Sequence, residues 1–363
     1  MKIKILKYKI PIIWLDTSVL SNFQIYKSRG KFKSTKHENY IEQLYRVIHI
    51  KTREKKLIFA LGDQFDELNG RTEEEFFDRR RTSNKLSMNI KMKNRQIIQN
   101  DQLNEAMEFY AGKTSVLNFS AENIFDQDPL EKMNQNQKYS ISIENKNDYL
   151  SAENRKLQSL DFQSELENVH KAISEKKVTY EEHLKEEYLG RLRAIDIIRA
   201  RHKEKLIKIL SDVNLNKFEN EAELIYNLIN CLDYNEYWIY KDIEEMWKSA
   251  NNVREKFFFL NLFPYYEEVE LFLKSNVYKS LPYVDISSKL TAKIFVGQKK
   301  IASGDRMDIE HLSTVVPFVN YVVTDTAMKN HLKELEIDRI YNTEIYGSKF
   351  NDYSKLIEKL ENL

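Results

Sequence analysis

The sequence contains very little cysteine, glycine and proline, and each shortage excludes a class of protein. One cysteine among 363 residues, Cys231, excludes an internal disulfide and a thiolate metal cluster. Eight glycines and five prolines allow few tight turns. The composition therefore disfavours a β-sandwich or barrel and favours long helices. A chain of this length is large enough for two or three domains, or for one domain with a large insertion.

Long apolar runs and an excess of one charge are also missing. No run approaches the ~20 apolar residues of a membrane helix, and charged residues alternate with apolar ones over residues 1–7, where a signal peptide would have an apolar core. We therefore expect a cytoplasmic protein with no membrane partner. Because 57 basic residues balance 56 acidic ones, only local clusters of charge can argue for nucleic acid.

Near the amino terminus, an apolar run ends in a carboxylate. Ile12 to Leu15 fit a parallel strand that is buried on both faces, and Asp16 follows directly. A helix is expected from residue 17, because apolar residues recur there at three- and four-residue spacing. Ligand sites in open parallel sheets lie outside such strand ends. Asp16 is therefore either a functional acid or only the cap of this helix, and the stretch alone favours neither.

The same pattern recurs later in the chain. A second apolar run at residues 57–60 is followed by an acidic cluster that contains Glu67, and a third run at residues 321–324 ends in Asp325 at the start of a helix. Alternating strands and helices predict an α/β fold with a parallel sheet flanked by helices.

The carboxyl-terminal part holds a fourth acid of interest. A helix is expected to open at Asp308 and to stop before Pro317, which places Asp308 in the first turn. The alternative role for Asp308 is a capping pair with Asp305. A last strand is expected at residues 340–342 and a last helix over residues 353–360.

The middle of the chain is predicted to be mainly helical. Residues 71–107 are highly charged and fit a solvated helix face or mobile loop better than a strip that contacts phosphates. Residues 118–150 are polar and are expected to be irregular, with one short strand allowed at 139–143. A long helix over residues 151–210 carries the densest basic segment. This segment fits a surface helix, with a role in holding a phosphate backbone as the minority alternative. Its candidate nucleic-acid-binding residues are Arg191, Arg193, Arg199, Arg201 and Lys205.

Four acids, Asp16, Glu67, Asp308 and Asp325, are thus predicted at strand ends or in a first helical turn. Carboxylates that are brought together repel one another, so raised pKa values or a bound cation are expected. Mg²⁺ and Mn²⁺ prefer such oxygen ligands, and a metal held there stabilises a phosphodiester under attack. The hypothesis from these residues is phosphodiester hydrolysis, with the four acids as both the catalytic and the metal-binding set.

The order of these motifs resembles the PIN domain, and in particular bacterial PIN-like proteins with a long helical insertion. The motifs are Leu15-Asp16-Thr17-Ser18, Glu67-Leu68, Asp308 and Val322-Val323-Thr324-Asp325. The resemblance implies a compact parallel sheet and a metal-dependent nuclease, most often a ribonuclease. It covers roughly residues 9–70 and 280–350. Two departures are the adjacency of Thr324 to Asp325 and the very long interval between Glu67 and Asp308.

Under this hypothesis the chain has three parts and an RNA partner. Residues 1–70 and 281–363 form the two halves of a PIN-like core, and residues 71–280 form the helical insertion. The substrate is expected to be single-stranded or structured RNA, in a toxin, defence or RNA-processing setting, and the insertion is a candidate surface for a protein partner or a second copy of the chain. The rival hypothesis is a catalytically inactive PIN-like scaffold or RNA-binding partner. A haloacid-dehalogenase-like phosphatase is disfavoured because Ser18 stands where its second aspartate belongs, and a von Willebrand-type metal site because Leu20 replaces a hydroxyl.

Overall fold

A parallel sheet of four strands forms the centre of the structure, a computed structural model. Its order is β3-β2-β5-β6. The strands are β2 (Ile12–Leu15), β3 (Ile58–Phe59), β5 (Tyr321–Val323) and β6 (Glu344–Tyr346). The structure describes residues 3–32, 34–65, 67–68, 72–135, 163, 167–212, 234–251, 265–297, 301 and 303–363.

The central strand β2 shows why this sheet is apolar throughout. Ile12 and Trp14 pack into one hydrophobic core, whereas Ile13 and Leu15 pack into a second core on the opposite face. Successive side chains of a strand point to opposite faces, so a strand covered on both sides needs an unbroken apolar run. The predicted α/β fold with a parallel sheet flanked by helices is confirmed.

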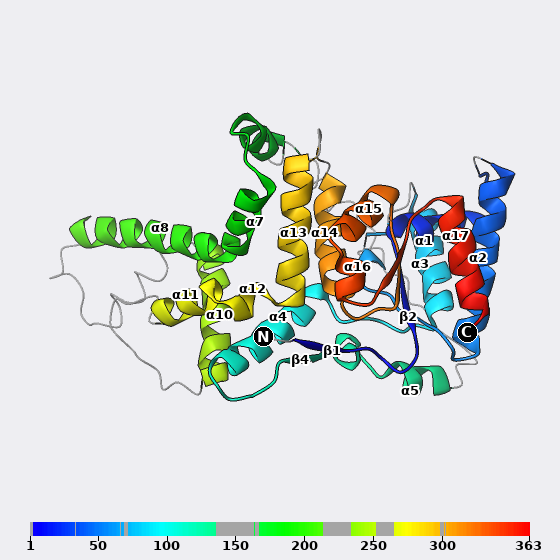
Figure 1. Cartoon of the computed structure of the whole chain (residues 1–363), viewed down its shortest axis with the longest axis horizontal. Helices are drawn as coiled ribbons and strands as arrows, with labels where there is room; N and C mark the ends of the chain where they lie inside the picture. The colour runs from blue at the N-terminus through cyan, green and yellow to red at the C-terminus, as the bar shows by residue number, and fades with distance from the viewer. Residues whose placement is uncertain are drawn as a thin grey trace.

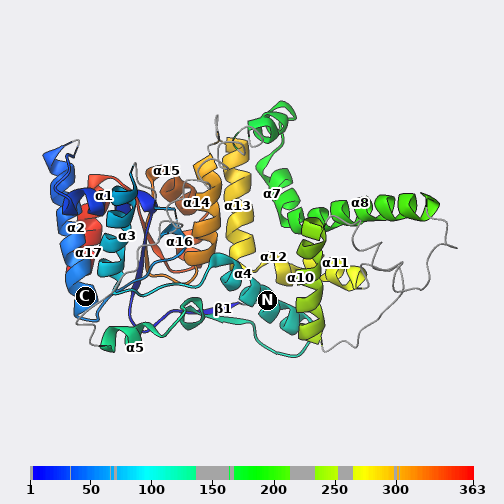
Figure 2. The same ribbon diagram turned by 180° about the vertical axis from the view of Figure 1, so that it is seen from behind.

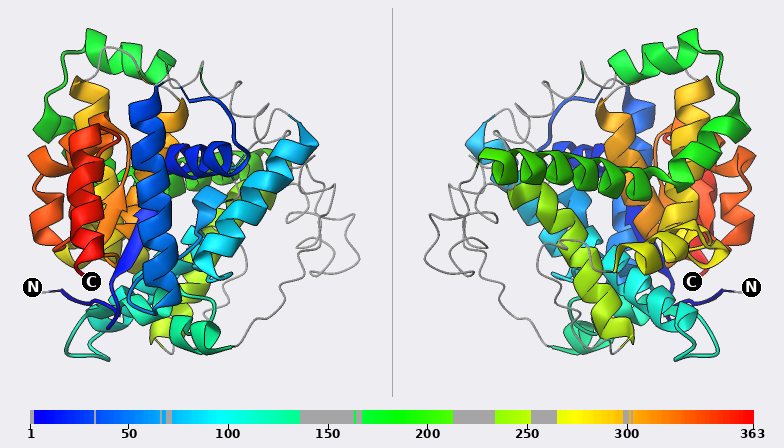
Figure 3. Two further views of the ribbon diagram at one scale, coloured as in Figure 1. Left: turned by 90° about the vertical axis from the view of Figure 1, so that its right-hand side faces the viewer. Right: turned by 90° about the vertical axis from the view of Figure 1, so that its left-hand side faces the viewer.

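One face of the sheet is covered by helices from both ends of the chain. They are α1 (Thr17–Lys27), α2 (Thr35–Arg53), α3 (Glu73–Ser87) and α17 (Phe350–Glu361). Helix α17 packs along α2, so the two ends of the sequence close the same layer (Figure 3).

The opposite face is covered by a second group of helices. They are α4 (Arg95–Tyr110), α13 (Pro282–Gly297), α14 (Ser303–Val315), α15 (Thr326–Glu334) and α16 (Ile337–Ile340). Helix α13 packs against both α14 and α7 (Tyr180–Tyr188). This group therefore links the sheet to the helical remainder of the chain.

The remaining helices form the other end of the molecule. Figure 1 shows α8 (Gly190–Asp212), α10 (Tyr234–Asn251) and α11 (Tyr266–Lys274) at the end of the long axis opposite α2 and α17, and the view from behind in Figure 2 agrees. Aromatic residues of this end build a core: the ring centres of Trp247 and Phe272 lie 6.1 Å apart. The short helix α12 (Asn276–Lys279) leads back towards α13.

A small second sheet joins the amino terminus to the middle of the chain. Strand β1 (Lys4–Leu6) pairs in parallel with β4 (Asn118–Ser120). The expectation of an irregular segment at residues 118–150 is therefore wrong at its start, because Phe119 is buried and anchors a strand there. The short helices η1 (Asp63–Phe65), η2 (Ala121–Ile124) and α5 (Pro129–Asn134) complete the fold. The strand expected at residues 139–143 lies outside the described residues.

Three further sequence expectations need correction. Residues 71–107 fold largely as α3 and α4, which agrees with the expected helix and not with the alternative of a mobile loop. These helices are more than a solvated face, because Phe76 and Leu103 are both completely buried and give each helix a packed face. The last strand is β6 rather than residues 340–342: Ile340 is 55% exposed, whereas Ile345 is 4% exposed and packs in the core. The last helix, α17, begins three residues earlier than expected and ends one residue later.

Helix α14 begins at Ser303, so Asp308 lies in its second turn and not in the first. Gly304 is part of the first turn of α14. Asp305 in that same turn is favourable beside the positive end of the helix dipole.

Candidate functional site

The strand order creates a switch point between β2 and β5. After β2 the chain crosses through α1 and α2 to β3 on one side, and after β5 it crosses through α15 and α16 to β6 on the other side. In open parallel sheets a crevice forms outside the carboxyl ends of the two strands at such a point. Leu15 and Val323 are register partners. Asp16 and Asp325 follow these two strand ends at the switch point.

Asp16 and Asp325 both occupy helix N-cap positions but use their carboxylates differently. The Asp325 Oδ1 atom accepts hydrogen bonds from the backbone N–H groups of Ala327 and Met328, at 2.6 and 3.1 Å. Asp16 makes no side-chain capping hydrogen bond with α1, and its Oδ2 atom accepts a 2.9 Å hydrogen bond from the Ser18 hydroxyl. The capping role therefore accounts for the side chain of Asp325 and not for that of Asp16.

The electrostatics of Asp16 fit a crowded acidic site. Burial raises the pKa of Asp16; the Ser18 hydrogen bond opposes that rise, and the negative charge of Asp325 adds to it. A carboxylate that lacks a cation and lies near another carboxylate is easier to protonate.

Asp308 connects the remaining acids to this pair. Burial raises the pKa of Asp308 to about 8, and the charges of Asp16, Asp325 and Glu67 add to the rise in that order. A smaller contribution comes from Asp305. Asp16, Glu67 and Asp325 are thus each within electrostatic range of Asp308.

Glu67 lies in the turn after η1 and has a more mixed environment. Burial raises the pKa of Glu67 to about 7, while the guanidinium of Arg95 opposes the rise and the charges of Asp16 and Asp63 add to it. A hydrogen bond from the Thr17 hydroxyl also lowers the pKa of Glu67. Arg95 is held 2.8 Å from Glu310, on the same helix as Asp308.

His311 is a further neighbour of these acids. Its Nε2 atom lies 3.3 Å from Glu67 Oε1, and neither atom has a hydrogen-bond partner within the described residues. Burial, with a contribution from Arg95, lowers the pKa of His311 to about 4, so the imidazole is neutral at pH 7. The spacing from Asp308 to His311 puts both on one face of α14, which is the signal that could have identified it.

The carboxylate oxygens of these four acids are the type of ligand that a hard divalent cation prefers. One of these oxygens, Glu67 Oε1, is buried without a hydrogen-bond partner in the described part of the chain. Across that same part, however, no three His, Cys, Asp or Glu side chains are placed closely enough to form a ready-made metal site. The acids therefore share one electrostatic environment without being preassembled as ligands.

The predicted nucleic-acid-binding residues lie on α8, far from the sheet (Figure 1). Arg193 forms an ion pair with Glu186, and the guanidinium of Arg199 lies 3.9 Å from the centre of the Tyr266 ring. Arg191 is half-buried and Arg201 is exposed. The side chain of Lys205 lies outside the described part of the structure.

The second basic segment, on α3, is tied to its own neighbours. Arg79 and Arg81 pair with Glu75 and Asp78 on the same helix, and the guanidinium of Arg80 lies 4.3 Å from the centre of the Phe65 ring. These side chains pack and pair within the chain.

Comparison with known proteins gave no match to a protein-family model, a curated protein or a solved structure. Within the described ranges, no helix is both long and apolar enough to cross a membrane.

Proposed function

We propose that the protein is a metal-dependent nuclease of the PIN-like type that hydrolyses phosphodiester bonds in RNA. The observation that supports this proposal is the environment of Asp308, a carboxyl group whose pKa is raised to about 8 by burial and by the three other acids around the switch point. Carboxylates crowded in this way destabilise the folded chain unless a cation offsets their repulsion. Carboxyl groups with perturbed pKa values in a crevice are typical of functional sites.

In this proposal Asp16, Asp308 and Asp325, with Glu67, hold Mg²⁺ or Mn²⁺. The cation would supply charge stabilisation and lower the pKa of a bound water. The capping hydrogen bonds of Asp325 fix its carboxylate against α15, whereas Asp16 makes no such capping bond and accepts a hydrogen bond from the Ser18 hydroxyl. Of these two acids, Asp16 is thus the one whose orientation a ligand can change at lower cost to the fold.

Glu67 and His311 are suited to proton transfer beside these acids. A carboxyl group with a pKa of about 7 exchanges its proton readily at neutral pH. The neutral imidazole of His311, 3.3 Å away, can accept or donate a hydrogen bond to it. The positive charge of Arg95 limits how far the pKa of Glu67 rises. Glu67 would give up this proton when the cation binds, because a metal ligand must be ionised, and the neutral His311 could then donate a hydrogen bond to Glu67 Oε1.

The test compares the parent chain with Asp16→Asn on labelled single-stranded RNA and DNA, with Mn²⁺ or Mg²⁺ and with EDTA. Asp242→Asn is the matched control because Asp242 is exposed on α10. We expect the parent and the control to cleave RNA, with at least a ~100-fold loss for Asp16→Asn, as is typical when charge-stabilising groups are removed. The nuclease proposal is overturned if the parent and Asp16→Asn cleave RNA at the same rate, or if neither of them cleaves it.

Calorimetric titration of the chain with Mn²⁺ separates metal binding from catalysis. Binding that Asp16→Asn weakens, without any cleavage by the parent, favours the rival hypothesis of an inactive scaffold or RNA-binding partner. If the parent does not bind Mn²⁺, the proposal of a metal cofactor is wrong.

A further inference from the structure

The segment that joins α1 to α2 carries charge of one sign only. Residues 27–36 contain five basic residues and no acid. Arg29, Lys31 and Lys36 are exposed, and none of them forms an ion pair with another described residue. A surface lined by charges of one sign attracts a polyanion and speeds its association. This basic segment is therefore open to an anionic chain from outside the protein.

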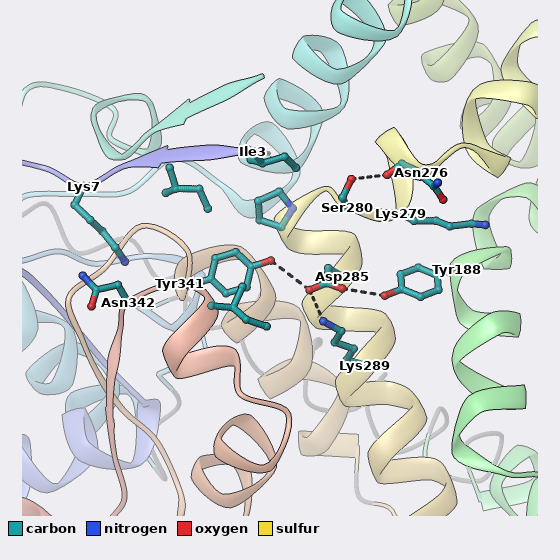
Figure 4. Close-up of a pocket in the computed structure, with 13 residues that line it drawn as sticks. Ile3, Lys7, Tyr188, Asn276, Lys279, Ser280, Asp285, Lys289, Tyr341 and Asn342 are labelled. Atoms are coloured by element: carbon teal, nitrogen blue, oxygen red, sulfur yellow. Dashed lines mark hydrogen bonds and ion pairs between the residues drawn. The ribbon is translucent and has the colours of Figure 1, made fainter. Parts of the chain in front are cut away.

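Basic side chains of other clusters have partners within the chain. On α3 the arginines pair with acids or pack on a ring of their own surroundings. On α13, Lys289 Nζ lies 2.8 Å from Asp285, whose carboxylate also accepts hydrogen bonds from Tyr188 Oη at 2.9 Å and Tyr341 Oη at 3.4 Å (Figure 4). The basic segment between α1 and α2 differs from these clusters because its exposed cations lack a carboxylate partner among the described residues.

Both ends of the basic segment are fixed by hydrogen bonds. The backbone N–H of Gly30 donates to the carbonyl oxygen of Ile25 at 2.9 Å and closes the end of α1. Ser34 caps α2, because its hydroxyl oxygen accepts a 3.2 Å hydrogen bond from the backbone N–H of His37. The positive charges are therefore anchored to two packed helices.

Partly exposed aromatic rings lie beside these cations. The rings of Tyr40 on α2 and Phe350 on α17 are stacked, with centres 5.5 Å apart and an interplanar angle of 19°. Lys36 Nζ lies 5.0 Å from the centre of the Phe350 ring. Tyr40, Phe350 and the nearby Phe32 are half-buried, so each ring keeps part of its surface in contact with solvent. Bases of a single strand stack on such rings, whereas the bases of a duplex are already stacked on one another.

The rings lie at the edge of the sheet that carries the acids. Phe350 is the first residue of α17, which begins shortly after the carboxyl end of β6. Tyr353 lies one turn further along the same helix. Burial, followed by the charges of Asp16 and Asp352, raises the pKa of Tyr353 to about 12. The beginning of α17 is therefore within electrostatic range of Asp16.

The basic segment lies at this edge too, because α2 and α17 run side by side in the same direction (Figure 3). Tyr40 and Phe350 meet near the starts of the two helices, and Lys51 Nζ donates to the carbonyl oxygen of Glu361 at 2.9 Å near their ends. Helix α1, with 11 residues, spans ~16 Å between Asp16 and the basic segment. A strand bound at the acids therefore reaches both the rings and the cations.

We propose that the basic segment and the rings of Tyr40 and Phe350 form a binding surface for single-stranded RNA beside the acids. Arg29, Lys31 and Lys36 contact phosphates, and a base stacks on the exposed part of the rings. The choice of RNA rests on the proposed nuclease function. Binding itself needs neither a metal ion nor catalysis, because the contacts are ionic and aromatic.

The charge contacts are tested by fluorescence anisotropy with a labelled RNA of about ten nucleotides, a length within the range of single-strand sites. EDTA is present, so that the RNA is not cleaved. Arg29→Ala combined with Lys31→Ala should weaken binding and reduce the slope of log affinity against log salt by ~1.4, which is ~0.7 for each lost phosphate contact. Lys4→Ala combined with Lys185→Ala is the matched control, because both lysines are exposed, on β1 and α7. This control should bind like the parent.

The stacking contact is tested at Phe350. Phe350→Ala should lose at least ~5-fold in affinity, the loss expected for one stacked base, whereas Phe350→Tyr keeps a ring and should keep the affinity. Duplex RNA of the same sequence should bind more weakly than the single strand. Thermal unfolding of each variant shows whether a loss of affinity is a loss of fold.

Three results each overturn the proposal: no binding of the single strand by the parent, equal affinity for the duplex, or equal loss in the Arg29, Lys31 variant and its control. Failure of the nuclease gives a different result. A parent that binds RNA through this surface but does not cleave it with Mn²⁺ contradicts the nuclease and supports the surface. A parent that cleaves RNA but whose binding is unchanged in these variants contradicts the surface alone.

Discussion

Replacing Asp308 with asparagine should stabilise the metal-free protein, although it should also abolish nuclease activity. In the folded chain the pKa of Asp308 is raised to about 8 by burial and by Asp16, Asp325 and Glu67. An unfolded aspartate has a pKa of ~3.9. Between these two values the folded state binds more protons than the unfolded state, so the contribution of Asp308 to stability becomes less favourable as pH rises through this interval.

The size of this effect follows from the difference between the folded and unfolded pKa values of Asp308. At pH 7 the carboxyl group is more than three pH units above its unfolded pKa, and at ~1.36 kcal/mol per unit the upper bound is about 4 kcal/mol. Solvent screening reduces the charge repulsion at a half-buried site, so we expect a gain of about 1–3 kcal/mol for Asp308→Asn. The gain should reach a plateau above pH 8 and vanish near pH 4, where the folded parent and the folded variant both carry a neutral side chain at this position.

Urea unfolding in EDTA from pH 4 to pH 9 measures this dependence. The parent, Asp308→Asn and the exposed control Asp242→Asn are compared at each pH. Addition of Mn²⁺ should then stabilise the parent and not Asp308→Asn, because only a ligand that binds the folded state raises its stability. A destabilised Asp308→Asn, or a difference from the parent that does not change with pH, would refute the reasoning that these acids repel one another.

Four further perturbations test the fold and its surfaces. Asp325→Ala should lose about 1 kcal/mol of stability because it removes two capping hydrogen bonds, whereas Asp325→Asn should keep most of it; urea unfolding distinguishes them. Asp285→Ala should cost about 2–4 kcal/mol because it leaves three donors without their acceptor, and a cost below 1 kcal/mol would show that these bonds are not formed. Leu15→Ala should cost about 2–5 kcal/mol, measured in the same way, because Leu15 is completely buried. Arg199→Glu combined with Arg201→Glu should weaken RNA binding and its salt dependence in a filter assay; unchanged binding would make α8 a solvated helix only.

The elements that the sequence predicted well are those with a local physical cause. Ile12 to Leu15 form a strand buried on both faces, and the apolar run alone required that. The acids after β2 and β5 could be placed at strand ends for the same reason.

Boundaries were less predictable where local patterns compete. Asp305 and Asp308 both suit the start of a helix, and only the structure shows that α14 begins at Ser303. Ile340 was expected in a strand because it is apolar, yet it is 55% exposed, and Asn342 with a φ of 50° turns the chain before β6. Apolar character alone does not reveal which residues of a short segment meet the core.

The sequence by itself determined that carboxylates would follow buried strands, because the alternation of apolar runs and helices is a local property. Only the tertiary structure decided that β2 and β5 are neighbours and that Asp308 and Glu67 come within electrostatic range of Asp16. The proposed RNA-binding surface likewise depends on the contact between Tyr40 and Phe350. Most of these contacts join residues more than 200 positions apart. They are set by the way in which the two cores pack on the sheet, and the periodicity of a single segment does not encode that packing.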